Sequence, residues 1–287
     1  MLKRTDINIR DPFVLPWEGK YYLYGTRGST AFNKLAYGID VFVSDDLENW
    51  DGPHEVFRKT DDFWADHCFW APEVHVYGGR FIMLATFAVG EGRMGTSSLC
   101  ADSPMGPFKP MQPGTLTPEK WMCLDGTLYV SPSGEPYLVF CHEWTQIGDG
   151  EVCAVRLNAD LSAAEGEPVT LFRASDGAPN IRPIREGCWV TDGPFMLRTA
   201  DGRLHMLWSS FGEGGYVQAL AHSDNDDVTG HWTVDDRLLF DHDGGHGMIF
   251  RTFDGRTMLT LHSPNRGGEE RPVFIGIGYE NGRLVGV

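Results

Sequence analysis

Four acidic residues and one histidine recur along the chain in the same local setting. Each stands just before an apolar segment, which leads through a glycine-containing turn into a second apolar segment. The first example is Asp11, which precedes Pro-Phe-Val, a turn at Gly19 and an aromatic segment over residues 21–24. The residues that open the five segments are Asp11, Glu73, Asp125, Asp192 and His246.

Carboxylates that meet in one place can perform acid and base chemistry. Their mutual repulsion keeps at least one of them protonated near neutral pH. A protonated carboxyl group beside an ionised one is the pair that cleavage of a glycosidic bond needs, since one donates a proton to the leaving oxygen and the other activates water or attacks directly. Carboxylates on separate repeats can stand roughly 6.5–9.5 Å apart, the separation that admits a water and inverts the anomeric centre.

The spacing of these residues predicts the fold that brings them together. They lie 52 to 67 positions apart, which indicates a repeat protein whose hairpins stack on one another. The apolar segments are short, rich in aromatic and β-branched residues, and bounded by Gly, Pro, Asp or Asn, which favours an all-β class. We therefore expect a five-bladed β-propeller with four-stranded antiparallel blades, as a single catalytic domain over residues 1–287.

In such a propeller the first strand of each blade lines the axis, so the five residues would meet at one mouth. An aspartate at a strand start is ordinarily a turn residue, and the shared position in the repeat is what favours chemistry. Two further elements are expected. Residues 44–50 resemble an Asp-box corner between strands, and residues 237–240 would form the outer strand of the fourth blade.

The composition and net charge of the chain disfavour several classes of binding partner. The formal net charge is −16, from 24 basic and 40 acidic residues, which opposes binding to nucleic acid and to anionic membranes. There is no apolar run of roughly 20 residues and no visible signal peptide. The six cysteines lack metal-site spacing and are expected to be reduced thiols. We expect a cytoplasmic protein, unless a leader has been removed.

The motifs around the five residues resemble those of glycoside hydrolase family 43, whose five-bladed propeller enzymes act on arabinofuranosides, xylosides and some galactosides. The resemblance covers essentially the whole chain, and the order and spacing of the motifs carry it. The matching segments are residues 10–13, 70–73, 124–127, 135–140, 191–195, His246 and residues 261–265.

The resemblance implies a role for each residue. Asp11 matches the general base, and Asp125 matches the carboxylate that orients the acid and raises its pKa. Asp192 stands where the family has a glutamate general acid, and one methylene fewer places its proton about 1.5 Å further back. Glu73 stands where the family has a supporting aspartate, so it is the alternative acid. His246 matches an axial histidine that reaches a central water or calcium; a metal-linked role through water and a simple hydrogen-bonding role are both open.

Substrate contacts are expected from aromatic side chains, because their flat faces pack on the C–H faces of sugars. Phe69 and Trp70 precede the second-blade motif, and Trp144 follows the second strand of the third blade; Phe32 is a weaker candidate. Arg271 could approach the site from the fifth blade or form an outer salt bridge. No cofactor is required, with an axial calcium ion as the open alternative.

The resulting hypothesis is an exo-acting, inverting glycosidase on a glycoside or oligosaccharide. It would remove terminal α-L-arabinofuranosyl or β-D-xylosyl residues, with galactosyl as a further option. The chain has no room for an additional β-sandwich, which favours arabinofuranosides. Two alternatives stay open: a carbohydrate-binding propeller with weak or no hydrolysis, motivated by the short Asp192, and a retaining or phosphorolytic relative.

Overall fold

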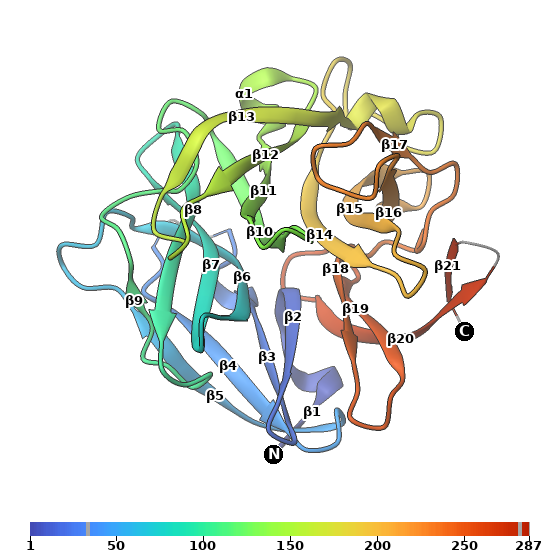
Figure 1. Ribbon diagram of the computed structural model, residues 1–287. Coiled ribbons are helices and arrows are strands. Elements are labelled where there is room, and N and C mark those ends of the chain that lie inside the picture. Colours follow the sequence, from blue (N-terminus) through green and yellow to red (C-terminus); the bar gives the residue numbers. More distant parts are fainter. Residues whose placement is uncertain (33–34, 281–282, 287) are drawn as a thin grey trace.

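The fold is known from a computed structural model, which describes residues 1–32, 35–280 and 283–286. Five antiparallel sheets stand around a central axis, and the first strand of each blade lies innermost (Figure 1). The predicted five-bladed β-propeller is therefore confirmed. Among the described residues, no helix has the length and apolar character needed to span a bilayer.

The strands of each blade follow one another in chain order from the axis outwards, and β1 (Leu2–Lys3) adds a fifth strand to the edge of the first blade. Blade by blade, the strands are β2 (Ile9–Trp17), β3 (Lys20–Arg27), β4 (Gly38–Ser44) and β5 (Asn49–Arg58); β6 (His67–Tyr77), β7 (Arg80–Val89), β8 (Arg93–Ala101) and β9 (Lys109–Pro110); β10 (Cys123–Val130), β11 (Pro136–His142), β12 (Glu151–Leu157) and β13 (Ala164–Arg173); β14 (Asp192–Arg198), β15 (Leu204–Gly212), β16 (Gly215–Ser223) and β17 (Trp232–Val234); β18 (Gly245–Arg251), β19 (Thr257–Ser263), β20 (Arg271–Glu280) and β21 (Arg283–Gly286). The helical turns of the described residues are η1 (Arg4–Asp6), η2 (Gly28–Thr30), α1 (Trp144–Ile147) and η3 (Ala174–Gly177).

The outer strand of the fourth blade differs from the prediction. It is β17, which pairs with β16, and residues 237–240 form no strand: Phe240 alone of these residues pairs with β16, through an isolated antiparallel bridge to Gln218. Leu239 and Phe240 pack against the apolar cluster between the fourth and fifth blades. The backbone N–H groups of both residues donate to the carbonyl of Gln218, at 2.8 and 3.3 Å. This segment is apolar because it fills the space between two blades, and its apolar character led to the prediction of a strand.

The predicted Asp-box corner is confirmed. The Ser44 hydroxyl accepts a hydrogen bond from the Leu47 N–H at 2.9 Å, and the Asp46 carboxylate accepts from the N–H groups of Glu48 and Asn49 at 2.9 and 2.8 Å. Trp50 is fully buried behind the corner. The corner closes β4 onto β5 and lies at the outer part of the blade, away from the axis.

Each inner strand contains a bulge near its start, and the first bulged residue has a left-handed backbone. The register of every inner pair shifts at this point. A positive φ is rare for residues other than glycine and is often retained at functional sites. The five residues and their φ angles are Asp11 (52°), Ala71 (45°), Asp125 (57°), Gly193 (51°) and His246 (53°).

This register corrects the predicted equivalence of the five repeats. Asp11, Asp125 and His246 are equivalent, as expected. In the second blade the equivalent residue is Ala71, and Glu73 lies two positions further along β6. In the fourth blade it is Gly193, and Asp192 lies one position earlier. The five polar side chains therefore reach the axis at different heights rather than as one ring.

A side chain of the preceding blade fixes most of these bulges. The backbone N–H of Ala71 donates to the Thr26 hydroxyl at 2.8 Å, and that of Asp125 donates to the Thr86 hydroxyl at 2.8 Å. In the same way the His246 N–H donates to the Ser209 hydroxyl at 2.7 Å. Each acceptor lies on the second strand of its blade, so one set of bonds both shapes the axial residue and joins neighbouring blades.

The same type of hydrogen bond joins the first blade to the fifth, whereas the fourth blade uses a different kind of acceptor. The Asp11 N–H donates to Nδ1 of His262 in the fifth blade at 3.1 Å. In the third blade the equivalent position holds Cys141, which pairs with Leu124. There the Gly193 N–H donates to the Asp125 carboxylate instead, at 3.1 Å. A functional carboxylate thus takes the place of a structural hydroxyl.

Ring closure also depends on a buried ion pair between the first and last blades. Arg10 approaches Glu270 at 2.7 Å, and the Glu270 side chain is fully buried. Asn8 donates to the Glu270 carbonyl at 3.0 Å, and Arg4 donates to the Pro272 carbonyl at 2.9 Å. The N-terminal segment is thereby held against the fifth blade.

We predict that Glu270→Gln lowers the free energy of unfolding by about 3 kcal/mol, because it leaves the Arg10 guanidinium buried without its counter-charge. Glu269→Gln is the matched control: its side chain is exposed, and it should change stability by less than about 0.5 kcal/mol. Guanidinium chloride unfolding of both variants measures the difference. Equal stabilities would contradict the role given to this ion pair.

Candidate active site

A cavity of about 180 Å³ opens at the mouth of the propeller. It brings together the three carboxylates predicted to be catalytic, which come from the first, third and fourth blades. Its lining includes Asp11, Asp125, Asp192, His246, Trp70 and Trp144.

Asp11 is buried and held as an anion. Burial alone would raise its pKa, but the positive charges of His246 and Arg10 and the Thr26 hydroxyl outweigh that effect and lower the pKa to about 2. The Thr26 hydroxyl donates to Oδ2 at 2.6 Å, and His246 Nδ1 lies 3.2 Å from Oδ1. Asp11 is therefore ionised throughout the neutral range.

His246 stands between two carboxylates. Its Nδ1 lies 3.2 Å from Asp11 and 3.7 Å from Asp125. Burial opposes protonation, but the negative charges of Asp11 and then Asp125 raise the pKa above its ordinary value. The imidazolium thus supplies positive charge on the axis, and its ring packs directly over Gly193.

Asp125 and Asp192 form the second part of the site, and both have a raised pKa. Burial is the largest cause, acting against the attraction of His246, and it raises the pKa of Asp125 to about 7. The negative charge of Asp192 adds to the effect on Asp125. Asp192 accepts a hydrogen bond from the Tyr216 hydroxyl at 3.0 Å.

Glu143 is a fourth carboxyl group in the cavity, and the sequence did not single it out. Its side chain is buried, and burial followed by the negative charge of Asp192 raises its pKa to about 8. It directly follows β11 and precedes α1, at the end of the strand that faces the mouth. The available signal was its place beside Trp144, one residue after the second strand of a blade.

Three other residues that support the site were also missed. His262 is buried and neutral, since burial lowers its pKa to about 4, and its Nδ1 accepts the Asp11 N–H. The Tyr216 ring stacks on His262, with centroids 5.5 Å apart. Arg10 adjoins Asp11 in sequence and lines the cavity. Arg10 and His262 lie inside the motifs that carry the family resemblance, which was a usable signal.

Three of the aromatic residues predicted to contact substrate line the cavity, and one does not. Trp70, Trp144 and Phe32 line the cavity. The Trp70 indole donates to the Ala31 carbonyl at 2.7 Å, and the Arg10 guanidinium lies over the Phe32 ring, 5.0 Å from its centroid. Phe69 was predicted wrongly. Neighbours on a strand point to opposite faces, so Phe69 packs away from the mouth in a buried aromatic cluster with Phe57, Phe63 and Phe87.

Glu73 and Arg271 do not line this cavity. Glu73 borders a much smaller hollow on the axis, and its carboxylate lies 2.9 Å from His75 Nε2. Arg271 begins β20, and its guanidinium donates to the carbonyls of Thr5, Gly268 and Glu270. Its contacts are with the N-terminal segment and its own loop rather than with the site.

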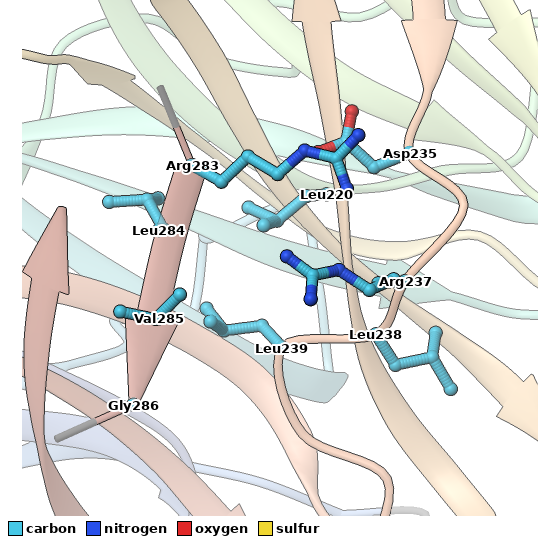
Figure 2. Close-up of a pocket in the computed structure, with 9 residues that line it drawn as sticks. All are labelled: Leu220, Asp235, Arg237, Leu238, Leu239, Arg283, Leu284, Val285 and Gly286. Carbon is cyan, nitrogen blue, oxygen red and sulfur yellow. The ribbon is translucent and has the colours of Figure 1, made fainter. Parts of the chain in front are cut away.

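A second hollow of similar size, about 190 Å³, lies away from the carboxylates. Figure 2 shows it between β21 and the segment that follows β17, with Arg237 and Arg283 among its lining residues. Leucine side chains such as Leu220, Leu239 and Leu284 form much of its wall. None of the predicted site residues borders it.

A metal site made of protein side chains alone is not seen around His246 among the described residues. Within the described parts of the chain, no group of three or more His, Cys, Asp and Glu side chains is arranged to hold a metal ion. The Nδ1 of His246 already faces Asp11 and Asp125, as an ion pair. The axial calcium stays a prediction of the family resemblance, and no chemical step below depends on it.

Gly193 provides a test of how the imidazole is positioned. A Cβ at this residue would lie 2.7 Å from His246 Cδ2, so Gly193→Ala must displace the ring from Asp11 and Asp125. We expect kcat to fall at least about tenfold, since misplacement by ~1 Å can cost about a hundredfold.

Gly134→Ala is the control for backbone strain alone, because Gly134 has φ +88° and open space around its Cα. It should lower thermal stability to a similar extent and leave kcat unchanged. Full activity in Gly193→Ala would contradict the proposed positioning of His246.

Comparison with known proteins agrees with this geometry. A family model described as glycosyl hydrolases family 43 matches residues 6–279. The solved endo-arabinase of Bacteroides thetaiotaomicron VPI-5482 is 40% identical, with a TM-score of 0.90 and 99% of each chain covered. A solved α-L-arabinofuranosidase of Lactobacillus brevis is 17% identical, with a TM-score of 0.78, covering 98% of this chain and 95% of that one. No curated protein matches the chain. The predicted resemblance is thus confirmed: the chain belongs to glycosyl hydrolases family 43 and is a glycosidase.

Proposed function

We propose that this glycosidase hydrolyses α-L-arabinofuranosyl or β-D-xylosyl linkages with inversion of the anomeric centre. The observation that carries the proposal is the contrast between carboxyl groups in one cavity: the pKa of Asp11 is lowered to about 2, while that of Asp125 is raised to about 7. Environments that separate pKa values in this way define a base and an acid.

The base is assigned to Asp11. Its Oδ2 accepts the Thr26 hydroxyl and its Oδ1 faces His246, so the carboxylate is fixed in position and in charge. A water held between Asp11 and the anomeric carbon would give its proton to the carboxylate as it attacks. This is the inverting arrangement, in which base and acid stand on opposite sides of the sugar.

The acid belongs to the opposite part of the cavity, where Asp125 and Asp192 come from the third and fourth blades. Asp192 occupies the motif position that the family resemblance gives to the acid. Asp125 faces His246 and accepts the Gly193 N–H, which suits a group that orients its neighbours. The alternative acid Glu73 is disfavoured, because it lies outside this cavity and faces His75.

The cavity supports a small sugar as substrate. Its volume of about 180 Å³ suits one sugar ring, and Trp70 and Trp144 provide flat apolar surfaces for it. The neighbour at 40% identity is named an endo-arabinase, which favours arabinose over xylose. Removal of a terminal residue needs room for one sugar ring, whereas attack within a chain would require the polymer to cross the rim near Phe32 and Trp144. The acid and base environments favour catalysis over a sugar-binding role alone.

We predict that Asp11→Asn lowers kcat by about a hundredfold or more, because the attacking water loses its proton acceptor. Asparagine tolerates the left-handed backbone of this position, so the fold should survive. Asp45→Asn is the control, since Asp45 is exposed and pairs with Lys20. The first product, followed by proton NMR, should have the inverted anomeric configuration. Full activity in Asp11→Asn, a retained anomer, or a sugar phosphate would each contradict the mechanism.

The pH dependence of kcat/KM should be broad on the acid side. Because the pKa of Asp11 is lowered to about 2, the base stays ionised down to about pH 3. The pKa of Asp192 is raised, and those of its neighbours Asp125 and Glu143 are raised to about 7 and about 8. Activity should therefore fall as pH rises above neutrality and this group of carboxyls loses the proton that the leaving oxygen needs. His246→Asn removes a positive charge beside Asp11 and should move the acidic limb to higher pH. An unmoved acidic limb in that variant would contradict the role of His246.

A further inference from the structure

We propose that Glu143, rather than Asp192, delivers the proton to the leaving oxygen, with Asp192 as the anionic partner that keeps Glu143 protonated. This inference rests on the proposed glycosidase mechanism and assigns its acid.

The backbone of Glu143 is fixed at the mouth. Its N–H donates to the Met122 carbonyl at 2.8 Å, and its own carbonyl accepts from the N–H groups of Gln146 and Ile147 at 3.0 and 3.3 Å. The residue lies between the end of β11 and the start of α1, so its side chain enters the cavity from a fixed strand end. A catalytic group needs this kind of support, because small displacements are costly in rate.

The side chain of Glu143 is prepared to donate a proton. It is only 8% exposed, and its Oε2 is buried without a hydrogen-bond partner. A buried carboxylate with an unpaired oxygen is strongly disfavoured, whereas the neutral acid offers an O–H toward the cavity.

The ionisable groups that influence Glu143 from the neighbouring strands are carboxyl groups and a thiol. Asp192 and Asp125 add negative charge, and Cys123 is a buried thiol whose own pKa is raised. Arg185 lies over the adjacent Trp144 ring, with its guanidinium 5.6 Å from the ring centroid. Burial and the charge of Asp192 raise the pKa of Glu143 to about 8, although hydrogen bonds from the Trp144 N–H and the Thr145 side chain to its carboxyl group act in the opposite direction.

Asp192 lies in a setting that favours its anion more. The Tyr216 hydroxyl donates to it at 3.0 Å, and the positive charges of His246 and Arg10 also lower its pKa, against the larger effect of burial and the negative charge of Asp11. Glu143 has hydrogen bonds from Trp144 and Thr145 but no cation among the groups that shift its pKa. Two neighbouring carboxyl groups that share one proton place it on the member whose charge is less stabilised, and the absence of a cation makes that member Glu143.

The lengths of the two side chains also favour Glu143 as the acid. Asp192 precedes the bulge by one residue and carries a side chain one methylene shorter than the glutamate typical of the family. Glu143 approaches the same cavity from the third blade with the longer side chain. The glutamate length lost at position 192 is thus present on the neighbouring blade.

The step balances as an ordinary hydrolysis. The O–H bond of Glu143 breaks as its proton joins the glycosidic oxygen, and the bond from that oxygen to the anomeric carbon breaks with both electrons going to oxygen. Water adds to the anomeric carbon and gives one proton to Asp11. Proton exchange with solvent then restores the protonated Glu143 and the ionised Asp11.

The test compares Glu143→Gln and Asp192→Asn on two arabinofuranosides that differ in their leaving groups. A 2,4-dinitrophenyl group departs without protonation, while a methyl group requires it. We expect Glu143→Gln to lower kcat/KM on the methyl glycoside by about a hundredfold or more and to stay within about tenfold on the dinitrophenyl glycoside. Asp192→Asn should reduce both to a similar extent. Glu119→Gln, at an exposed glutamate, is the control.

The opposite pattern, with the leaving-group effect in Asp192→Asn and equal losses in Glu143→Gln, would overturn the assignment while leaving the hydrolase intact. A wild-type enzyme that cleaves neither compound nor the corresponding xylosides would instead overturn the proposed function, and the assignment with it. A second readout does not use turnover. Carbon-13 NMR of labelled glutamate, assigned with Glu143→Gln, should show the Glu143 carboxyl titrating well above pH 6, and titration near pH 4 would contradict the proposal.

Discussion

The left-handed bulge at the head of each inner strand is the constraint on which the rest of the structure depends. It turns one residue per blade toward the axis, and in all five blades a side chain of the preceding blade accepts its N–H. The fifth case is the informative one, because Gly193 donates to the Asp125 carboxylate where the other blades use a hydroxyl or an imidazole. Blade packing and the geometry of the site are therefore determined by the same hydrogen bonds.

Charged side chains are distributed unevenly within the cavity, and this separates the pKa values of its carboxyl groups. His246 and Arg10 are concentrated near Asp11, where they overcome the cost of burial and keep the carboxylate ionised. At Asp125 and Asp192 the attraction of the same His246 does not overcome the effect of burial, and negative charge from neighbouring carboxylates raises the pKa of Asp125 and Glu143 further. Carboxyl groups that share one cavity therefore differ in their pKa.

The sequence predicted the propeller, the convergence of Asp11, Asp125 and Asp192, and the places of Trp70 and Trp144, because strand periodicity and short motifs encode these features locally. It misplaced Glu73 and Asp192 in the repeat, because the bulge is defined by backbone angle and not by acidity. It misassigned Phe69, whose neighbour Trp70 takes the face toward the mouth. Glu143 was not predicted as a site residue, because it lies outside the inner strand and its burial arises from contacts between blades.

The central claim is that protons are distributed unequally among the carboxyl groups of one cavity before any substrate binds. Neutron diffraction from deuterated crystals at pH 6 tests it directly, since the deuterons on carboxyl groups become visible. The account predicts an Asp11 carboxylate without a deuteron, deuterons on both nitrogens of His246, and a deuteron on Glu143. A deuteron on Asp11, together with a bare Glu143 carboxylate, would contradict it.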